Sequence, residues 1–449
     1  MKLRAIETAG VALAYLSARR RNRLRTQAQV RAHQLRRWRA LSRWLTAHSP
    51  FYATYAGQPL ECWPVMDKAQ WMARFDEINT AGVTLDDAYS VAERAELDRD
   101  FAPTLDGISV GLSTGTSGAR GVFMVSASER RRWAGTMLAK LLPGGLMARE
   151  RIALMLRAGN NLYDTVHGGR LSFRYFDLVQ PVDQIAEELD AYAPTILIGP
   201  AQVLAWLAQL HSQGRVRVMP RRVISAAEVL DPLDRVRIER TWDVTVEQIY
   251  QATEGFLGHT CPHGVLHLNE DSLIVEREWI DPAQRRFVPI VTDLYRYTQP
   301  VVRYRLDDVL VAREEPCPCG SPHAALERIE GREDDIVWLP GRTDGTAVPL
   351  FADVLTRALL MADRTIADYQ IDQEAPDTLR IAIIPSPDAV RKRQLRDALN
   401  TLCQRLAVDT PGLVFTPMSR QALTEKRRRV RGLRAVAETV SAPGTAGNA

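Results

Sequence analysis

The sequence lacks a hydrophobic run long enough to cross a bilayer. Residues 6–16 form an apolar stretch near the amino terminus, but it is shorter than the ~20 residues that a membrane-spanning helix needs. No small-residue cleavage site follows this stretch, so we do not expect a signal peptide. We therefore expect a cytoplasmic protein, and its 449 residues predict two or three domains.

Cysteine is scarce, at five residues, and the count is odd. Without a secretory signal, this number does not indicate a disulfide framework. Cys62 and Cys403 have no evident partner in the sequence, and we expect both of them in the hydrophobic core.

Acidic residues are nearly absent from the first 48 residues. This segment contains twelve lysines and arginines against one acid, Glu7, so its net charge is +11, whereas the remainder of the chain carries about −7. A basic segment of this kind is typical of nucleic-acid or membrane-surface binding. The acidic remainder, and the lack of aromatic residues interleaved with the basic ones, argue against nucleic acid.

An amphipathic helix is the interpretation that we favour for this basic arm. Apolar residues recur there at three- and four-residue spacing, which predicts one buried face and a solvated face that carries the arginines. The predicted apolar face consists of Leu35, Trp38, Leu41, Trp44 and Leu45. A weak peripheral contact with a membrane stays open as an alternative.

Short apolar runs alternate with helical stretches beyond the arm, which predicts an α/β sheet architecture. The predicted strands are 108–112, 122–125, 152–156, 195–199, 222–225, 301–304 and 309–312, and the predicted helices are 201–213 and 232–241. The last hundred or so residues predict a small α+β unit, with strands at 379–384 and 413–417 and a helix at 389–406. We expect a helical arm (1–48), a large domain (49–331), a small domain (332–440) and a disordered tail (441–449).

A loop of glycines and small hydroxylated residues lies between two of these strands. It consists of Ser113, Thr114, Gly115, Thr116, Ser117 and Gly118. Such a loop can direct several backbone N–H groups and hydroxyls at one anion, because glycine leaves room for a phosphate. No lysine follows Gly118 and no helix is predicted after the loop, so it differs from the common nucleotide-binding loop. A simple hairpin turn is the alternative.

Together with three later segments, this loop resembles the motifs of the acyl-adenylate-forming superfamily, and in particular its phenylacetate–CoA ligase branch. "STGTSGARG" resembles the family's phosphate loop, "IYQATEGFLG" its Tyr-Gly-x-Ser/Thr-Glu motif, "PVVRYRLDDV" its Arg-Tyr-Arg-x-x-Asp segment and "GREDD" its hinge. "TEKRRRV" is a weaker match to the family's C-terminal lysine region. The segments occur in the family order and span about residues 45–432. The resemblance implies a large adenylating domain of stacked mixed sheets and helices, followed by a small mobile α+β domain.

The resemblance also implies a role for each motif residue. The loop residues 113–118 would bind the phosphates of ATP, Thr253 would contact the α-phosphate, and Glu254 would ligate Mg²⁺. Asp308 would accept hydrogen bonds from the ribose. Such groups suit a reaction between two anions, whose charges must be neutralised and held in line.

Three further residues belong to the second half of the implied machinery. Arg332 would lie beside the nucleotide, Asp334 would be the hinge position, and Lys426 would contact the carboxylate and the α-phosphate during adenylation. The sequence departs from the family at Ala119–Arg120, where Lys-Pro is usual, at Gln251 instead of glycine, and at Glu425 before the lysine. Arg303 and Arg305 could simply pair with acids.

A structural zinc site is a further expectation. Three thiols and an imidazole form a complete tetrahedral ligand set, here Cys261, His267, Cys317 and Cys319. The phenylacetate–CoA ligase branch carries a similar Cys, Leu-His and Cys-Pro-Cys-Gly pattern. His263 is a competing ligand, and free thiols on neighbouring loops are the alternative.

The substrate and the acceptor are the least defined expectations. By resemblance, the acid would bind near Ala226 and Ala227, whose small side chains leave room for an aromatic ring such as a hydroxybenzoate. Asn160, Asn161, Tyr163 and His167 could approach this pocket or be structural. The acceptor thiol would belong to coenzyme A or to the phosphopantetheine of an acyl carrier protein, which the basic arm could dock. A homodimer and a non-catalytic zinc-stapled scaffold stay open.

Overall fold

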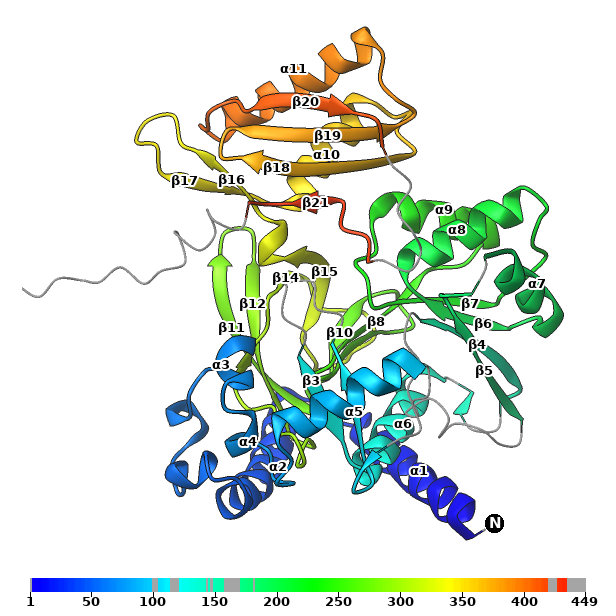
Figure 1. The fold of residues 1–449 in the computed structure, drawn as a ribbon, viewed down its shortest axis with the longest axis vertical. Helices are drawn as coiled ribbons and strands as arrows, with labels where there is room; N and C mark the ends of the chain where they lie inside the picture. The colour runs from blue at the N-terminus through cyan, green and yellow to red at the C-terminus, as the bar shows by residue number, and fades with distance from the viewer. Residues whose placement is uncertain are drawn as a thin grey trace, which may run out of the picture. The chain divides into compact units, whose positions relative to one another are not determined.

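The computed structural model describes residues 2–98, 104–113, 121–142, 144–145, 148–156, 170–180, 182–418 and 426–433. The chain divides into two compact units (Figure 1). The first unit comprises Met1–Leu306 and Val311–Arg328, and the second comprises Asp307–Leu310 and Ile329–Ala449.

Helices of the first unit are α1 (Lys2–Arg21), α2 (Gln27–His48), α3 (Lys68–Met72), α4 (Phe75–Ile78), α5 (Leu85–Asp98), α6 (Ala127–Leu141), α7 (Val182–Tyr192), α8 (Ala201–Ser212) and α9 (Pro232–Trp242). Short 3₁₀ helices are η1 (Tyr52–Tyr55) and η2 (Leu60–Cys62). Helix starts follow local chemistry: Ser126 and Glu129 form a capping box before α6, and Asp231 caps α9 ahead of Pro232.

Strands of the first unit begin with a three-stranded antiparallel sheet of β1 (Thr104–Leu105), β2 (Ile108–Leu112) and β3 (Val122–Val125). The large sheet contains β4 (Glu150–Leu156), β5 (Leu171–Asp177), β6 (Ile196–Gly199), β7 (Arg222–Ala226), β8 (Glu247–Ala252), β9 (Gly255–Thr260), β10 (Leu266–Leu268), β11 (Leu273–Asp281), β12 (Arg286–Asp293) and β13 (Tyr304–Arg305). β14 (Asp308–Ala312) and β15 (Ala325–Arg332) also belong to this sheet, and each has residues in both units.

Among the described residues, the large sheet has twelve strands in the order β11-β12-β14-β15-β10-β9-β8-β7-β6-β4-β5, with β13 beside β12. Strands β4 to β8 pair in parallel, whereas β9 pairs antiparallel with β8 and β10. All four residues of β6 are buried, as expected for a parallel strand that is covered on both faces. Ile152 and Leu154 of β4 belong to a core cluster that includes residues of α1 and α6.

The basic arm is part of this core. Helix α1 packs closely on α6 at Gly135. A Cβ atom at this glycine would lie only 2.5 Å from the Tyr15 backbone nitrogen. Arg21, at the end of α1, is buried and pairs with Asp271, so the expected fully solvated arginine face is wrong at this position. Lys140 of α6 also contacts Asp271, so this one buried carboxylate pairs with two buried cations.

The predicted apolar face of α2 is partly correct. Trp38, Leu41 and Leu45 are buried, but Leu35 and Trp44 are 49% and 41% exposed. Of the two expected core cysteines, Cys403 is buried whereas Cys62 is exposed. No helix in the described part of the chain is long and apolar enough to span a membrane.

The second unit contains a four-stranded sheet of β18 (Asp368–Ala375), β19 (Thr378–Ile384), β20 (Gly412–Thr416) and β21 (Val430–Arg431), in the order β20-β19-β18-β21. Helices α10 (Ala352–Ala362) and α11 (Ala389–Arg405) accompany it, with the hairpin β16 (Val337–Pro340) and β17 (Ala347–Leu350) and the 3₁₀ helix η4 (Glu333–Asp335). Figure 1 shows these elements in yellow to red. The predicted α/β architecture, with a large mixed-sheet part and a small α+β part, is confirmed.

Candidate functional site

The two ends of the candidate phosphate loop are held together at its base. Ser113 follows β2 and Gly121 precedes β3; the Ser113 N–H donates to the Gly121 carbonyl at 2.7 Å, and the Gly121 N–H donates to Ser113 Oγ at 2.8 Å. Lys68 at the start of α3 also donates from Nζ to Ser113 Oγ, at 3.3 Å. The predicted residues Thr114, Gly115, Thr116, Ser117 and Gly118 lie outside the described residues. The positively charged side chain of Lys68 thus lies at the base of a loop that contains no lysine of its own.

Thr253 and Glu254 form the turn between β8 and β9. Thr253 Oγ1 donates a hydrogen bond to Glu254 Oε2 at 3.0 Å, and both residues are half-buried. Gly255 follows at close quarters with Asp293, because a Cβ atom on Gly255 would lie 2.9 Å from Asp293 Oδ2. The turn therefore presents one hydroxyl and one carboxylate, which are the ligand types that a phosphate and a divalent cation require.

Asp293 lies beneath this turn and was not predicted from the sequence. Burial raises its pKa to about 6, even though Arg296 opposes the shift. The backbone N–H of Tyr295 donates to Asp293 Oδ1 at 2.8 Å. Asp293 ends a fully buried strand, β12, so its carboxyl group has little access to water.

Arg296 and Gln299 were also missed. Arg296 donates from Nη1 to the Thr253 carbonyl at 3.2 Å and from Nη2 to the Met124 carbonyl at 3.2 Å. Met124 belongs to β3, the strand that follows the candidate phosphate loop. The arginine therefore joins the two candidate phosphate-binding elements of the first unit. No periodic pattern or motif in the sequence indicated this arginine.

The second unit contains the next set of predicted residues. Arg332 lies beside two acids: its Nη1 is 3.5 Å from Asp307 Oδ2 and its Nε is 3.7 Å from Asp308 Oδ1. Burial alone would lower the pKa of Arg332, but Asp307 and Asp308 raise it above its usual value. The backbone N–H of Arg332 donates to Asp335 Oδ2 at 2.8 Å, and the Asp334 carbonyl accepts from Gly432.

Lys426 begins the last described segment, residues 426–433, and is half-buried. The arginines that follow it are not a solvated run. Arg428 Nη2 lies 2.5 Å from Asp335 Oδ1, Arg429 Nε lies 3.2 Å from Asp368 Oδ1, and Arg427 also pairs with Asp368. Parallel pairing of β21 with β18 fixes the same segment. These contacts anchor the backbone beside Lys426 within the second unit.

The predicted acyl pocket is only partly described. Ala227 follows β7 with a φ of 66°, a left-handed conformation that is uncommon for a residue with a Cβ atom. The Gln202 N–H at the start of α8 donates to Glu228 Oε2 at 3.2 Å, so this turn is tied to the helix. Asn160, Asn161, Tyr163 and His167 lie outside the described residues.

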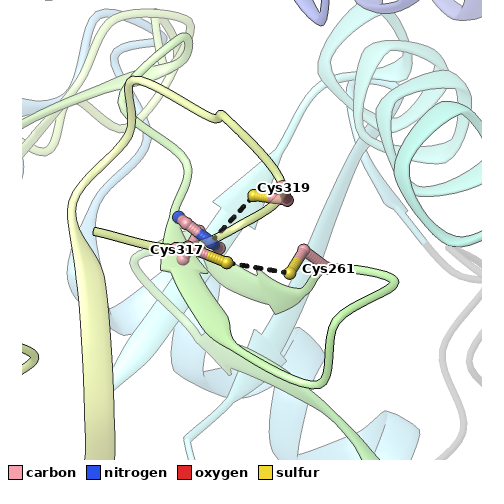
Figure 2. Close-up of side chains that lie close together, drawn as sticks. Cys261, Cys317 and Cys319 are labelled. Carbon is pink, nitrogen blue, oxygen red and sulfur yellow. Dashed lines mark hydrogen bonds between the residues drawn. The ribbon is translucent and has the colours of Figure 1, made fainter. Parts of the chain in front are cut away.

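The four predicted metal ligands come together in the first unit. Figure 2 shows how the three cysteines of this cluster lie. Cys261 follows β9, His267 is in β10, and Cys317 and Cys319 lie between β14 and β15. Cys261 Sγ is 3.6 Å from Cys317 Sγ, and Cys319 Sγ is 3.5 Å from His267 Nε2. All four ligand atoms lie within 4.8 Å of one another.

The Cys261–Cys317 and Cys319–His267 separations fit a tetrahedral zinc site. Zinc–sulfur bonds of about 2.3 Å and zinc–nitrogen bonds of about 2.0 Å place neighbouring ligand atoms about 3.5–3.8 Å apart. A disulfide would need a sulfur–sulfur distance of about 2.05 Å. Three of the four ligands are buried. His263, the competing ligand, is exposed and is not part of the cluster.

The histidine is oriented for metal binding by its second nitrogen. His267 Nδ1 lies 3.0 Å from the His323 carbonyl, to which an Nδ1–H would donate, leaving Nε2 directed toward Cys319. Burial lowers the pKa of His267, which favours the neutral ring that a metal needs. Burial also raises the pKa of Cys319 to about 12, so without a cation this thiol stays protonated.

No protein-family model and no curated protein matches the sequence. Solved structures do match its fold. One is 2-hydroxyisobutyryl-CoA ligase in the postadenylation state in complex with 2-HIB-AMP, with a TM-score of 0.69 and 17% identity over 94% of this chain and 93% of that chain. Another is the anthranilate CoA ligase AuaEII in complex with anthranoyl-AMP, with a TM-score of 0.52 and 15% identity over 75% and 67% of the two chains.

The amide bond synthetase McbA from Marinactinospora thermotolerans is a third match, with a TM-score of 0.50 and 14% identity over 72% of this chain and 68% of that chain. The first of these likenesses extends over both units of this chain. The chain therefore shares its fold with these ligases and with this synthetase.

Proposed function

We propose that this protein is an acid–thiol ligase that activates a carboxylic acid with ATP. The carboxylate oxygen attacks the α-phosphorus, the bond to the β-phosphate breaks, and pyrophosphate leaves. The acceptor thiol then loses its proton and its sulfur attacks the acyl carbon. As the carbon–sulfur bond forms, the bond between the acyl carbon and the phosphate oxygen breaks, and AMP leaves with that oxygen. The observation that carries this proposal is the adjacency of the Thr253–Glu254 turn and the strand after the phosphate loop, which Arg296 joins.

Each motif residue has a proposed role in the first half-reaction. Loop residues 113–118 and Lys68 bind the phosphates, and Thr253 donates its hydroxyl to the α-phosphate. Glu254 holds Mg²⁺, which would neutralise phosphate charge. Such preorganised charges supply much of the rate in reactions between anions.

In the second unit, Asp308 accepts hydrogen bonds from the ribose and Arg332 lies beside the nucleotide. Lys426 neutralises the carboxylate and the α-phosphate as the bond between them forms. The ion pairs of the following arginines support this role, because they fix the backbone from which Lys426 extends. Movement of the second unit as a mobile domain, with Asp334 at the hinge, is part of the proposal.

An aromatic acid of the hydroxybenzoate type is the proposed substrate. The small side chains of Ala226, the last residue of β7, and of Ala227 support it by leaving space for a flat ring. The match to an anthranilate CoA ligase agrees with an aromatic acid, whereas the match to a 2-hydroxyisobutyryl-CoA ligase makes small hydroxy acids the principal competitors.

The proposed acceptor is coenzyme A or the phosphopantetheine arm of an acyl carrier protein. A carrier protein is acidic as a rule, and Arg36 and Arg39 on α2 are exposed. Zinc at Cys261, His267, Cys317 and Cys319 has a structural role in this proposal, which the clustering of the four side chains supports. A cytoplasmic location and a homodimer complete it.

Acid-dependent exchange of pyrophosphate into ATP tests the function directly. The panel would include hydroxybenzoates, aryl-acetates, cinnamates, fatty acids and small 2-hydroxy acids. We expect exchange with one class and a loss of about 100-fold or more in Lys426→Ala. Lys392→Ala, on α11 of the same unit, is the matched control and should keep wild-type exchange. No exchange with any acid, from folded zinc-containing protein, would favour the non-catalytic scaffold.

A further inference from the structure

A buried arginine and a buried glutamine lie in the segment between β12 and β13. Arg296 is 9% exposed and Gln299 is 4% exposed. Burial of a guanidinium group is costly unless its donors are used, so the partners of Arg296 indicate why it is there. Two of these partners are backbone carbonyls, which carry no net charge but hold the guanidinium in a defined position.

Arg296 reaches both candidate phosphate-binding elements with one rigid group. Its Nη1 donates to the Thr253 carbonyl and its Nη2 to the Met124 carbonyl, each at 3.2 Å. The Nη2 atom also lies 3.0 Å from Gln299 Oε1. Because the guanidinium is planar, these bonds set the separation between Thr253 and the strand after the loop.

The Gln299 side chain forms hydrogen bonds with the backbone of β3, as a neighbouring strand would. Its Oε1 accepts from the Met124 N–H at 2.7 Å, and its Nε2 donates to the Val122 carbonyl at 2.9 Å. Val122 follows Gly121, which closes the phosphate loop through two hydrogen bonds with Ser113. The glutamine therefore fixes the position of the strand immediately adjoining that closure.

The turn that carries Thr253 is constrained from a second side. Gly255 lies so close to Asp293 Oδ2 that a Cβ atom there would be 2.9 Å away. Asp293 is three residues before Arg296, so one short segment contacts the turn at both ends. The turn therefore packs against the end of β12, and Arg296 links it to β3.

We propose that Arg296 and Gln299 are positioning residues that hold the α-phosphate-binding turn in register with the phosphate loop. They act through hydrogen bonds to the backbone of both elements, at Thr253, Met124 and Val122. In-line attack at phosphorus is sensitive to displacements of about 1 Å, which can cost about 100-fold in rate. This inference rests on the proposed adenylating function.

Kinetics of the exchange reaction separate positioning from simple binding. For Arg296→Met, we expect kcat to fall about 100-fold while the KM for ATP changes much less, because the reacting geometry is lost and not the contacts of the ground state. Arg296→Lys restores a single donor group and should recover part of the rate. Gln299→Met should lower kcat as well, and the double variant should lose less than the two single losses multiplied.

A matched control distinguishes this role from general stability. Arg286→Met removes another buried arginine, 3% exposed, from β12, where it pairs with Asp281. It should lower the thermal midpoint by an amount similar to Arg296→Met and leave kcat unchanged. Equal kcat losses in the two variants would assign Arg296 a purely structural role. A change in KM alone, or unchanged kinetics in Arg296→Met, would overturn the proposal.

Hydrogen–deuterium exchange provides a readout that does not need turnover. In Arg296→Met, segments 121–126 and 250–256 should both exchange faster than in wild type, whereas Arg286→Met should leave them unchanged. If the wild-type protein catalyses no pyrophosphate exchange, the proposed function fails independently of this result. If the two segments keep wild-type protection in Arg296→Met, the positioning role fails whatever the activity.

Discussion

The sulfur atoms of Cys261 and Cys317 lie 3.6 Å apart although 56 positions separate them in the chain. Cys261 follows the first strand of the β9–β10 hairpin, and Cys317 belongs to the loop that leads into β15. The cluster thus joins the hairpin that begins at the Thr253–Glu254 turn to a distant loop of the same unit.

Removal of one ligand should release the metal and loosen this junction. We expect Cys317→Ser to lose most of its zinc, measured by elemental analysis, and to be destabilised by on the order of 4 kcal/mol, because loss of a structural metal is among the largest single effects. Cys62→Ser, which changes an exposed cysteine outside the cluster, is the control and should retain both zinc and stability. Full zinc content in Cys317→Ser would contradict the site.

Asp271 should be essential for stability near neutral pH. It is fully buried between Arg21 and Lys140, so Asp271→Asn leaves two buried cations without compensation and should cost about 3–5 kcal/mol in unfolding free energy. Glu188→Gln, which breaks the more exposed pair with Arg174, should cost less than about 1 kcal/mol. Chemical denaturation of both variants measures the difference.

The same carboxylate should contribute to acid sensitivity. Burial alone would raise the pKa of Asp271, but Lys140 and Arg21 hold it well below its ordinary value. Because the pKa of Asp271 is lower in the folded than in the unfolded protein, its ionisation stabilises the folded state at pH values above its ordinary pKa of about 4. This contribution is lost as the pH falls below that value. The gap in stability between wild type and Asp271→Asn should therefore narrow below pH 4. A constant gap from pH 7 to pH 3 would exclude this origin.

Asp293 should show the opposite dependence on pH. Burial raises its pKa to about 6, so ionisation in the folded protein is unfavourable. Stability should fall as the pH rises from about 4 to above 6, by up to about 3 kcal/mol relative to Asp293→Asn, which cannot ionise. Unfolding free energies of both proteins at pH 4.5 and pH 7.5 test this, with Asp183→Asn on α7 as a control. A difference that does not vary with pH would contradict it.

Carrier-protein docking predicts an effect of charge reversal on α2. Arg36→Glu combined with Arg39→Glu should raise the KM for an acidic carrier protein roughly tenfold, since the encounter is electrostatic, and leave the KM for free coenzyme A unchanged. Arg37 is unsuitable for reversal, because its Nη2 donates to the Tyr297 hydroxyl at 2.8 Å and its guanidinium lies over the Tyr295 ring. Arg393→Glu, on an exposed site of α11, is the control. An unchanged KM for the carrier protein would exclude this docking surface.

Local patterns were enough to predict much of the secondary structure. The strand expected at 108–112 is β2 with the same bounds, and the helix expected at 201–213 is α8 to within one residue. These segments are apolar runs or amphipathic stretches whose own residues determine the conformation. The strand expected at 301–304 is correct only at Tyr304, which forms β13 with Arg305, whereas Val301 and Val302 are buried outside any strand.

Contacts between distant residues could not be predicted in the same way. A motif resemblance made Thr253 a candidate, and residue types made Cys261, His267, Cys317 and Cys319 candidate ligands, which do lie together in the structure. Nothing in the sequence marked Arg296 or Gln299, because their function depends on backbone carbonyls more than 40 positions away. The burial of Arg21 could not be predicted from the sequence either, because its partner Asp271 lies near it only in the folded chain.

The ion pair between Arg21 and Asp271 also has a consequence for synthesis on the ribosome. The two residues are 250 positions apart in the chain. At a translation rate of about 5–20 residues per second, Asp271 is therefore synthesised about 12–50 s after Arg21. During this interval the apolar side of α1, including Val11 and Tyr15, has to stay soluble until α6 and then the sheet emerge. A nascent chain of this protein should therefore depend on chaperones early, and a faster or slower translation rate should change its yield.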